Sequence, residues 1–346
     1  MHRPNRRASP EPSFAPTLPN VGQLAPGGLQ RRLVPESVNL SHFLVAVLVA
    51  ALLISVTQAQ RSASRPHFLG LAHVAFRVSD LDKTQAFYAR VLGYEQPFSL
   101  NDGGGKTTTT FIKVNDSQYV ELFQGDAQSE GQLDHFALYT DDLTAVRAYL
   151  QSLGMYIAKD THRGRIGNPF LTIRDPDGHF IEILQYSPSS LTGQARGKFM
   201  PHTRISDHIS HVGIVVSSLP VALSFYRDAL GLREVSRGGG ENAQPGWIDL
   251  RTVDGDDYVE LISKKVTPAE TGSQNHLGLA TADVRTTVAV LQARDAIGAG
   301  KSSIIVLTGG GLPARTNILD PDGARLEIME PLTAGARPIA TLAPKR

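Results

Sequence analysis

The sequence contains no cysteine. This absence excludes disulfide bonds, thiolate metal ligands, haem-attachment motifs and cysteine nucleophiles, so any bound metal must be held by nitrogen and oxygen atoms. An excess of charge of either sign is also missing: the formal net charge is +1, which gives no reason to expect nucleic acid or an acidic surface as a partner. A hydrophobic content of 41% and a length of 346 residues fit a globular protein with two domains, each large enough for its own core.

The first part of the chain lacks apolar periodicity. Residues 1–35 are rich in Pro, Gly and Arg, which is typical of a disordered leader. The uncharged apolar run at residues 43–56 follows Arg31 and Arg32 and precedes the small residues that end at Ala59, an order typical of a secretory signal peptide. A membrane anchor at residues 43–56 is the alternative, but a bilayer span needs roughly 20 residues. We therefore predict export, periplasmic or secreted, with residues 1–59 outside the folded protein.

An internal repeat organises the remaining chain. The segment HVAFRVS at residues 73–79 is matched by HVGIVVS at residues 211–217. Further matches follow in the same order, namely Phe87-Tyr88 with Phe225-Tyr226, Leu92-Gly93 with Leu230-Gly231, Tyr119-Val120-Glu121-Leu122 with Tyr258-Val259-Glu260-Leu261, and Asp175-Pro176-Asp177-Gly178 with Asp320-Pro321-Asp322-Gly323. Matched landmarks at a drifting offset indicate a duplicated domain whose loops differ in length. We predict domains at residues 68–187 and 207–331, a linker at 188–206 and a tail at 332–346.

Each domain is itself double, because a second histidine-led strand follows the first. Expected strands begin at His73, His135, His211 and His276, and each leads into an amphipathic helix. The helices have candidate capping residues at their starts, namely Ser79 or Asp80, Asp141 or Asp142, Ser217 or Ser218, and Asp283. Short β-rich runs with Asp-Gly turn signals follow each helix. The pattern predicts an α+β fold built from four βαβββ modules.

Strand alternation places ionisable residues on one face of these strands. Ala72, Val74, Phe76 and Val78 are wholly apolar and are expected to pack beneath the helix, so His73 points to the opposite face. The same phase applies to Glu121, His135 and Glu182 in the first domain, and to His211, Glu260, His276 and Glu327 in the second. A single such residue would be a satisfied core histidine or a solvated glutamate. The repeated order His, Glu, His, Glu instead predicts one divalent metal per domain, which could be Zn, Fe, Mn, Ni or Co.

These motifs resemble those of the vicinal-oxygen-chelate family, which includes glyoxalase I, extradiol dioxygenases and bleomycin resistance proteins. The features that carry the resemblance are paired βαβββ modules, the Phe-Tyr and Leu-Gly pairs of the helices, a first-strand His, and a DPDG turn four residues before a Glu. The resemblance implies cup-shaped mixed sheets around a metal that substrate oxygens chelate. It implies as metal ligands His73, Glu121, His135, Glu182, His211, Glu260, His276 and Glu327, and it leaves open which modules share a cup.

A four-ligand His/Glu set resembles glyoxalase I and the epimerases of the family. The resemblance implies a metal-dependent lyase or isomerase acting on a small-molecule substrate through an enediolate, with Glu121, Glu182, Glu260 and Glu327 as candidate proton-transfer residues. An Fe(II)-dependent ring-cleaving dioxygenase is the first alternative, although Thr172 and Asn317 stand where that class has a tyrosine. A metal-free small-molecule binding or resistance protein is the second. Trp247, Tyr119, Tyr139 and Tyr258 are candidates to line the cups or to pack them.

Overall fold

The protein is described here by a computed structural model, which covers residues 65–126, 132–157, 162–239, 245–263, 275–294, 304–309 and 312–331. Residues 62–346 form one compact unit. The leader, the apolar run at residues 43–56 and the tail at residues 332–346 lie outside the described residues. Within the described part of the chain, none of the helices combines the length and the apolar character that crossing a membrane requires.

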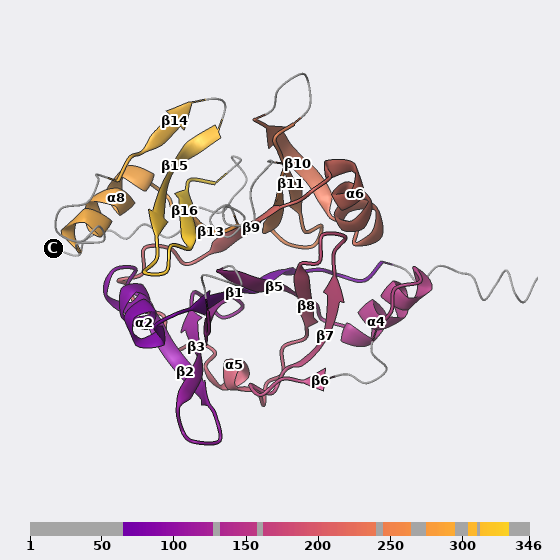
Figure 1. Ribbon diagram of the computed structural model, residues 1–346, viewed down its shortest axis with the longest axis horizontal. Coiled ribbons are helices and arrows are strands. Elements are labelled where there is room, and N and C mark those ends of the chain that lie inside the picture. The colour runs from indigo at the N-terminus through magenta and orange to yellow at the C-terminus, as the bar shows by residue number, and fades with distance from the viewer. Residues whose placement is uncertain are drawn as a thin grey trace, which may run out of the picture. The chain divides into compact units, whose positions relative to one another are not determined.

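In its described residues, the first half of the folded chain forms one eight-stranded mixed sheet with three helices, and we call it domain 1 (Figure 1). Its strands are β1 (Gly70–Val78), β2 (Glu95–Asn101), β3 (Thr107–Lys113), β4 (Tyr119–Gln124), β5 (Leu133–Tyr139), β6 (His162–Arg163), β7 (Pro169–Arg174) and β8 (Phe180–Leu184). Its helices are α2 (Leu81–Arg90), α4 (Leu143–Ser152) and the short α5 (Leu191–Gln194).

The second half repeats this arrangement as domain 2. Its strands are β9 (Ile209–Val215), β10 (Arg233–Gly238), β11 (Trp247–Arg251), β12 (Tyr258–Ile262), β13 (His276–Ala280), β14 (Leu307–Gly309), β15 (Leu312–Leu319) and β16 (Arg325–Met329). Its helical segments are α6 (Leu219–Leu223), η1 (Ser224–Ala229) and α8 (Val284–Ala293). The predicted α+β class and the two curled mixed sheets are confirmed.

Strand order shows which modules share a sheet. The orders are β2-β3-β4-β1-β5-β8-β7-β6 and β10-β11-β12-β9-β13-β16-β15-β14. The first strands of two consecutive modules are therefore antiparallel neighbours at the centre, β1 beside β5 and β9 beside β13. Each cup is built from the two modules of one domain, which answers the pairing question that the sequence left open.

The helices begin and end largely where the sequence predicts. Asp80, Asp142 and Asp283 each accept a hydrogen bond from a backbone N–H in the first turn of α2, α4 and α8, so each satisfies an otherwise unpaired donor. The third helix differs from the prediction. It starts at Leu219 after Ser218, whose side chain makes no capping bond, and it turns from α into the wider π form at Ser224.

One part of the strand-alternation prediction is wrong. Leu71, Val74, Phe76 and Val78 of β1 belong to the main core, but Ala72 packs in a separate small cluster with Ala137 and Leu184. The cause is a β-bulge, because the register of β1 against β5 shifts by one between Leu71 and His73. The extra residue turns Ala72 away from the helix side while leaving His73 on the face that the sequence predicted.

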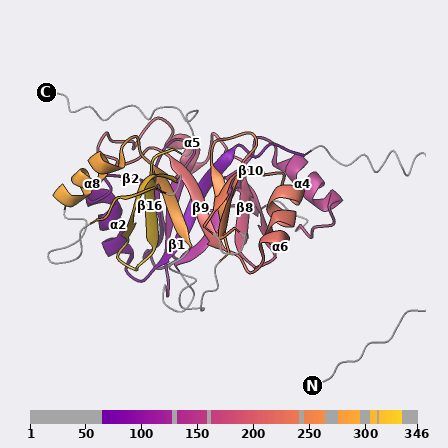
Figure 2. The same ribbon diagram turned by 90° about the horizontal axis from the view of Figure 1, so that it is seen from above.

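Helices of the two domains lie beside each other at both ends of the pair, as Figures 1 and 2 show, with α2 next to α8 and α4 next to α6. At one end Arg294, which follows α8, donates to the carbonyl oxygen of Val91 over 3.1 Å. At the other end the hydroxyl of Tyr149 on α4 donates to the carbonyl oxygen of Ala229 over 2.6 Å.

A buried polar contact joins the first strands of the two domains. Gln118, just before β4, donates to the carbonyl oxygen of Ile209 and accepts from its N–H, over 2.9 and 2.7 Å. Asp257, at the matching place before β12, accepts from the N–H of Leu71 over 2.6 Å and from the side chain of Gln118 over 3.1 Å. Backbone groups at the starts of β1 and β9 are thereby satisfied across the domain boundary.

The two DPDG turns also contact the opposite domain. Asp322 accepts hydrogen bonds from the N–H and hydroxyl of Ser79, ahead of α2, and from Thr84 within that helix. Asp177 accepts from the N–H of Ser217, ahead of α6. Both carboxylates lie at a helix N-terminus, where negative charge is favourable. The motifs that revealed the duplication thus help to hold the two copies together.

The linker between the domains is fixed by a buried lysine. Lys113 of β3 is fully buried, and its ammonium donates to the carboxylate of Asp116 and to the carbonyl oxygens of Ala195 and Lys198 over 2.5–2.9 Å. Three acceptors match the three N–H donors of an ammonium group, so its burial is compensated.

The paired tyrosines of the repeat differ in their hydrogen bonding, which gives a matched test of the domain interface. The hydroxyl of Tyr226 donates to Asp175 over 2.9 Å across the boundary, whereas the buried hydroxyl of Tyr88 has no hydrogen-bond partner among the described residues. We expect Tyr226→Phe to lower the free energy of unfolding by about 1–2 kcal/mol, and Tyr88→Phe to leave it unchanged or raise it. Urea unfolding curves measure both, and equal losses would contradict the assignment.

Candidate metal centres

The four central strands of domain 1 carry the four predicted ligand residues. His73 lies on β1, Glu121 on β4, His135 on β5 and Glu182 on β8. The Nε2 atoms of His73 and His135 are 2.9 Å apart. The nearest carboxylate oxygen of Glu121 lies 3.5 Å from Nε2 of His73 and 3.9 Å from that of His135, and the corresponding distances for Glu182 are 3.7 and 4.0 Å.

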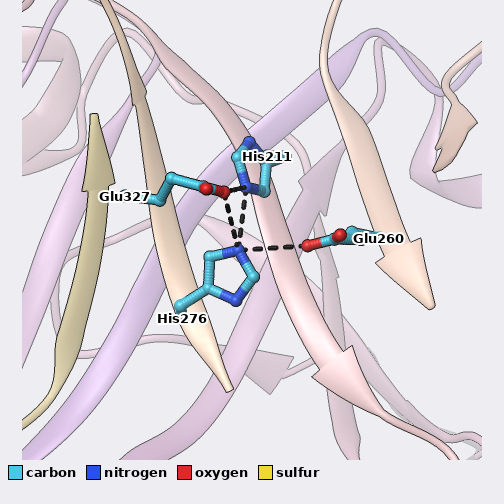
Figure 3. A group of neighbouring side chains, drawn as sticks. All are labelled: His211, Glu260, His276 and Glu327. Carbon is cyan, nitrogen blue, oxygen red and sulfur yellow. Dashed lines mark hydrogen bonds and ion pairs between the residues drawn. The ribbon is translucent and has the colours of Figure 1, made fainter. Parts of the chain in front are cut away.

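Domain 2 brings its four residues closer together. Figure 3 shows His211, Glu260, His276 and Glu327 pointing toward a common centre from neighbouring strands. The two Nε2 atoms are again 2.9 Å apart. An oxygen of Glu327 lies 3.3 and 3.4 Å from Nε2 of His211 and His276, and one of Glu260 lies 3.1 Å from Nε2 of His276. All four donor atoms lie within 4.8 Å of one another.

The donor atoms suit a divalent cation. Two neutral imidazole nitrogens that face each other at 2.9 Å in both domains can share one proton at most. Two ligands at about 2.1 Å from one ion, at right angles, would be separated by about this distance. Imidazole and carboxylate donors are those preferred by Zn, Fe, Mn, Ni and Co, and neither set contains a soft ligand. Domain 2 offers four donors to one centre, and domain 1 offers three with Glu182 further away.

Small residues beside the histidines control how closely the rings approach the sheet. In domain 2, Gly213 lies opposite His276 and Gly278 lies opposite His211 on the neighbouring antiparallel strand. A Cβ atom at Gly213 would lie 1.9 Å from Cε1 of His276, and one at Gly278 would lie 2.0 Å from Cε1 of His211. Only glycine leaves room for these ring positions.

Domain 1 has alanine at both matching positions. Ala75 lies opposite His135, and Ala137 lies opposite His73. The Nε2 atoms of the two histidines are nevertheless 2.9 Å apart in both domains.

The Nδ1 atom of the second histidine of each set, His135 or His276, has a different neighbour in the two domains. In domain 1, Nδ1 of His135 lies 2.8 Å from a carboxylate oxygen of Asp134, which also pairs with Arg77. This carboxylate fixes the ring orientation and leaves Nε2 facing the other candidate ligands. In domain 2, Nδ1 of His276 faces Arg325, and Nδ1 of His211 lies 3.0 Å from the hydroxyl of Ser210. Ser210 occupies the bulge position that Ala72 occupies in domain 1.

The pKa values of the glutamate carboxyl groups in the two sets are shifted in opposite directions. Burial raises the pKa of Glu121 to about 8, an effect that nearby His135 only partly offsets. Burial also opposes ionisation of Glu327, but its hydrogen bonds to His211 and His276 outweigh this and hold the pKa of that carboxyl below its usual range. The tighter contacts of domain 2 therefore keep Glu327 ionised, whereas Glu121 binds a proton more readily.

A cavity of about 180 Å³ lies over the domain 2 centre. His211, Glu260 and Glu327 line it together with Trp247, Asp249, Tyr258, Arg315, Arg325 and Met329. The ring of Tyr258 stacks on His211 with centroids 4.7 Å apart. Burial and the charges of Glu260 and Glu327 raise the pKa of Asp249 to about 8.

Sequence reasoning predicted eight ligand residues, which the structure brings together in two sets of four, but it missed several neighbours. Trp247 and Tyr258 were expected as lining or packing residues, and both line the cavity. Asp249, Arg315 and Arg325 were not singled out. In the sheet register Asp249 pairs with Glu260 and Arg325 pairs with His276, and Arg315 lies on β15, the neighbour of the strand that carries Glu327. A comparison of the repeats at these positions would have found them.

The model of the Glyoxalase/Bleomycin resistance protein/Dioxygenase superfamily matches residues 70–183 and again residues 208–328. These two matches cover both sheets, from β1 to β8 and from β9 to β16.

Curated relatives include two lactoylglutathione lyases. The enzyme of Schizosaccharomyces pombe is 24% identical over 304 residues, which are 75% of this chain and 96% of the relative. The enzyme GLX1 of Arabidopsis thaliana is 26% identical over 176 residues, which are 46% of this chain, and the match spans only 54% of that relative.

Two solved structures show the same fold at low sequence identity. The 2,3-dioxygenase LapB from Pseudomonas sp. KL28 superposes with a TM-score of 0.59 at 16% identity, covering 77% of this chain and 93% of that chain. The Mn(II)-bound glyoxalase from Novosphingobium aromaticivorans gives a TM-score of 0.57 at 19% identity, covering 78% of this chain and 84% of that one.

The glycine contacts generate a test that distinguishes the two centres. We expect Gly213→Ala to weaken divalent-cation binding by domain 2 at least about tenfold, because the added methyl group displaces the ring of His276 by more than a ligand position tolerates. The matched variant Ala75→Gly removes a methyl group at the same place in domain 1 and is expected to leave binding there intact or to strengthen it. Metal titrations followed by elemental analysis measure both, and unchanged affinity in Gly213→Ala would refute the argument.

Proposed function

Because this chain belongs to the glyoxalase/bleomycin resistance protein/dioxygenase superfamily, we propose that it is a divalent-metal-dependent lyase or isomerase. In this proposal it moves a proton between adjacent carbon atoms of a small oxygenated molecule. The observation that carries the proposal is the four-residue His/Glu set of domain 2, whose donor atoms converge within 4.8 Å at the floor of a cavity. The names of the lactoylglutathione lyases among its relatives support the lyase class.

The bound cation would supply Lewis acidity, polarising a carbonyl oxygen of the substrate so that the adjacent C–H becomes acidic. His211, His276 and Glu327 hold the ion in domain 2, because Glu327 is tied to both histidines. Glu260 is tied to His276 alone and lines the cavity, so it is the better placed to take the proton from one carbon and return it to the next.

Domain 1 divides the two roles between its glutamates in the opposite way to domain 2. His73, His135 and Glu121 form the group whose donor atoms lie together. Glu182 stands 3.7 and 4.0 Å from the two histidines, and a quarter of its side chain is exposed. We therefore propose Glu182 as the proton carrier of domain 1 and Glu121 as a ligand.

Solvent exchange tests these roles directly. In deuterium oxide, we expect the metal-loaded protein to incorporate deuterium at the carbon next to the carbonyl of a hydroxyketone or 2-oxoaldehyde, as followed by NMR. The double variant Glu182→Gln and Glu260→Gln is expected to lose this exchange by roughly 10²- to 10⁴-fold, the usual contribution of a positioned base. Elemental analysis of the same sample provides the control, because retained metal shows that the ligand sets remain intact.

Other outcomes would point to the alternatives. Oxygen consumption with Fe²⁺ and a catechol would replace the isomerase with a ring-cleaving dioxygenase. The residues that face the last glutamates make this outcome unexpected, since Thr172 lies opposite Glu182 and Asn317 lies opposite Glu327 in the sheets. A purified protein without metal, and without metal-dependent exchange, would leave a binding or resistance protein.

We also propose that the protein is exported, on the strength of the apolar run at residues 43–56 and the small residues that end at Ala59. N-terminal sequencing of the native protein is expected to begin at Gln60. A native chain that retains residues 43–56 and sediments with membranes would instead support the anchor.

A further inference from the structure

The two cups differ in the residues that surround their equivalent ligands. At three positions with the same place in the sheet register, domain 1 has phenylalanine and domain 2 has a charged residue. At the first position the residue pairs with Glu121 or Glu260 in the sheet register. At the second it lies two residues before Thr172 or Asn317, and at the third it pairs with His135 or His276. The pairs are Phe111 and Asp249, Phe170 and Arg315, and Phe180 and Arg325.

Asp249, Arg315 and Arg325 all line the domain 2 cavity, and Arg315 is the cation of this set that contacts a carboxylate of the ligand set. Its Nε lies 3.4 Å from Oε1 of Glu327, and it lines the cavity above the metal ligands. Its Nη1 is buried and has no hydrogen-bond partner among the described residues. Because Nη1 has almost no accessible surface, a ligand in the cavity would reach the exposed quarter of the Arg315 side chain. The ligand group that best matches a guanidinium is a carboxylate.

The position of Arg315 also fixes how far this acceptor lies from the ligands. Glu327 bridges the two features, since Oε1 faces Arg315 while Oε2 faces Nε2 of His211 and His276. A group bound by Arg315 would therefore be separated from the centre of the ligand set by the carboxyl group of Glu327. The cavity of about 180 Å³ is smaller than the roughly 300–1,000 Å³ of drug-sized pockets, so it suits a molecule of a few carbon atoms.

We propose that the domain 2 cup takes a short 2-oxo or 2-hydroxy acid, whose carboxylate binds Arg315 while the oxygen on the neighbouring carbon faces the His/Glu set. This inference rests on the proposed function and specifies its substrate class for one of the two cups. Domain 1 has phenylalanine at the positions of the two arginines, so the contact to Arg315 is specific to domain 2. The two centres thus share their ligand residue types and differ in the residues around them.

The chain contains its own reporter for this test. Trp247 is the single tryptophan of the sequence and lines the domain 2 cavity, so its fluorescence reports on that cup alone. The probes are 3-hydroxypyruvate and dihydroxyacetone, which share three carbons and a ketone and differ in a carboxylate against a hydroxymethyl group. We expect the zinc-loaded full chain to bind hydroxypyruvate at least about tenfold more tightly, as a charge-assisted hydrogen bond allows.

Variants assign the preference to one side chain. Arg315→Met is expected to remove the preference by weakening hydroxypyruvate binding and leaving dihydroxyacetone binding unchanged, and Arg315→Lys to retain part of it because the charge remains without the fork. Phe170→Met at the matching position of domain 1 is the control and should change neither affinity. Zinc content is measured for each variant, and the Lys variant decides the case if the Met variant loses zinc.

Equal affinity for the two probes in the unaltered protein, or a preference that survives in Arg315→Met, would overturn the inference. Its failure can be told apart from failure of the proposed function. A carboxylate preference without any deuterium exchange would retain the binding assignment and remove the catalytic one. Exchange that proceeds in both cups without a carboxylate preference would retain the catalytic assignment and remove the binding one.

Discussion

The close approach of each histidine ring to a small residue on the neighbouring antiparallel strand is the constraint on which both centres depend. The first strands of two modules are central neighbours in each sheet, so their histidines lie diagonally across the strand pair. The residues opposite the histidines are Ala75 and Ala137 in domain 1 and Gly213 and Gly278 in domain 2, where the rings come so close that a Cβ atom would lie 1.9–2.0 Å from them. The 2.9 Å between the Nε2 atoms follows from this placement, and the glutamates of the outer strands then close the sets.

The sequence was sufficient for the repeats, the fold class and the face on which the ligand residues lie, because strand alternation and duplicated motifs are local features. It could not place the bulge at Ala72, since a bulge changes the phase of alternation without a residue that demands it. It also could not show that the DPDG turns contact the opposite domain, because that depends on how the sheets pack. One signal was present and unused: a small residue follows each histidine at the second position in all four modules, as in His73-Val74-Ala75 and His211-Val212-Gly213.

The two domains keep the same ligand types while their surroundings have diverged. In domain 1 His135 is oriented by Asp134, the common arrangement for a metal-bound imidazole. In domain 2 the same nitrogen faces Arg325, and Arg315 lies beside Glu327. The charged neighbours therefore differ between the sets, with Asp134 and Arg77 in domain 1 and Arg315 and Arg325 in domain 2. Since the ligands themselves did not change, differences in chemistry between the cups must come from the residues beside them.

The reciprocal contacts of the turns link each centre to the other half of the chain. Asp177 and Asp322 immediately precede the strands that deliver Glu182 and Glu327, and each is held by a helix start of the opposite domain. The position of the last carboxylate in one half is thus set partly by the other half. Such interlocking disfavours loss of either copy during evolution, even where only one retains a reaction to perform. A half that no longer turns over substrate would still be kept as the scaffold of its twin.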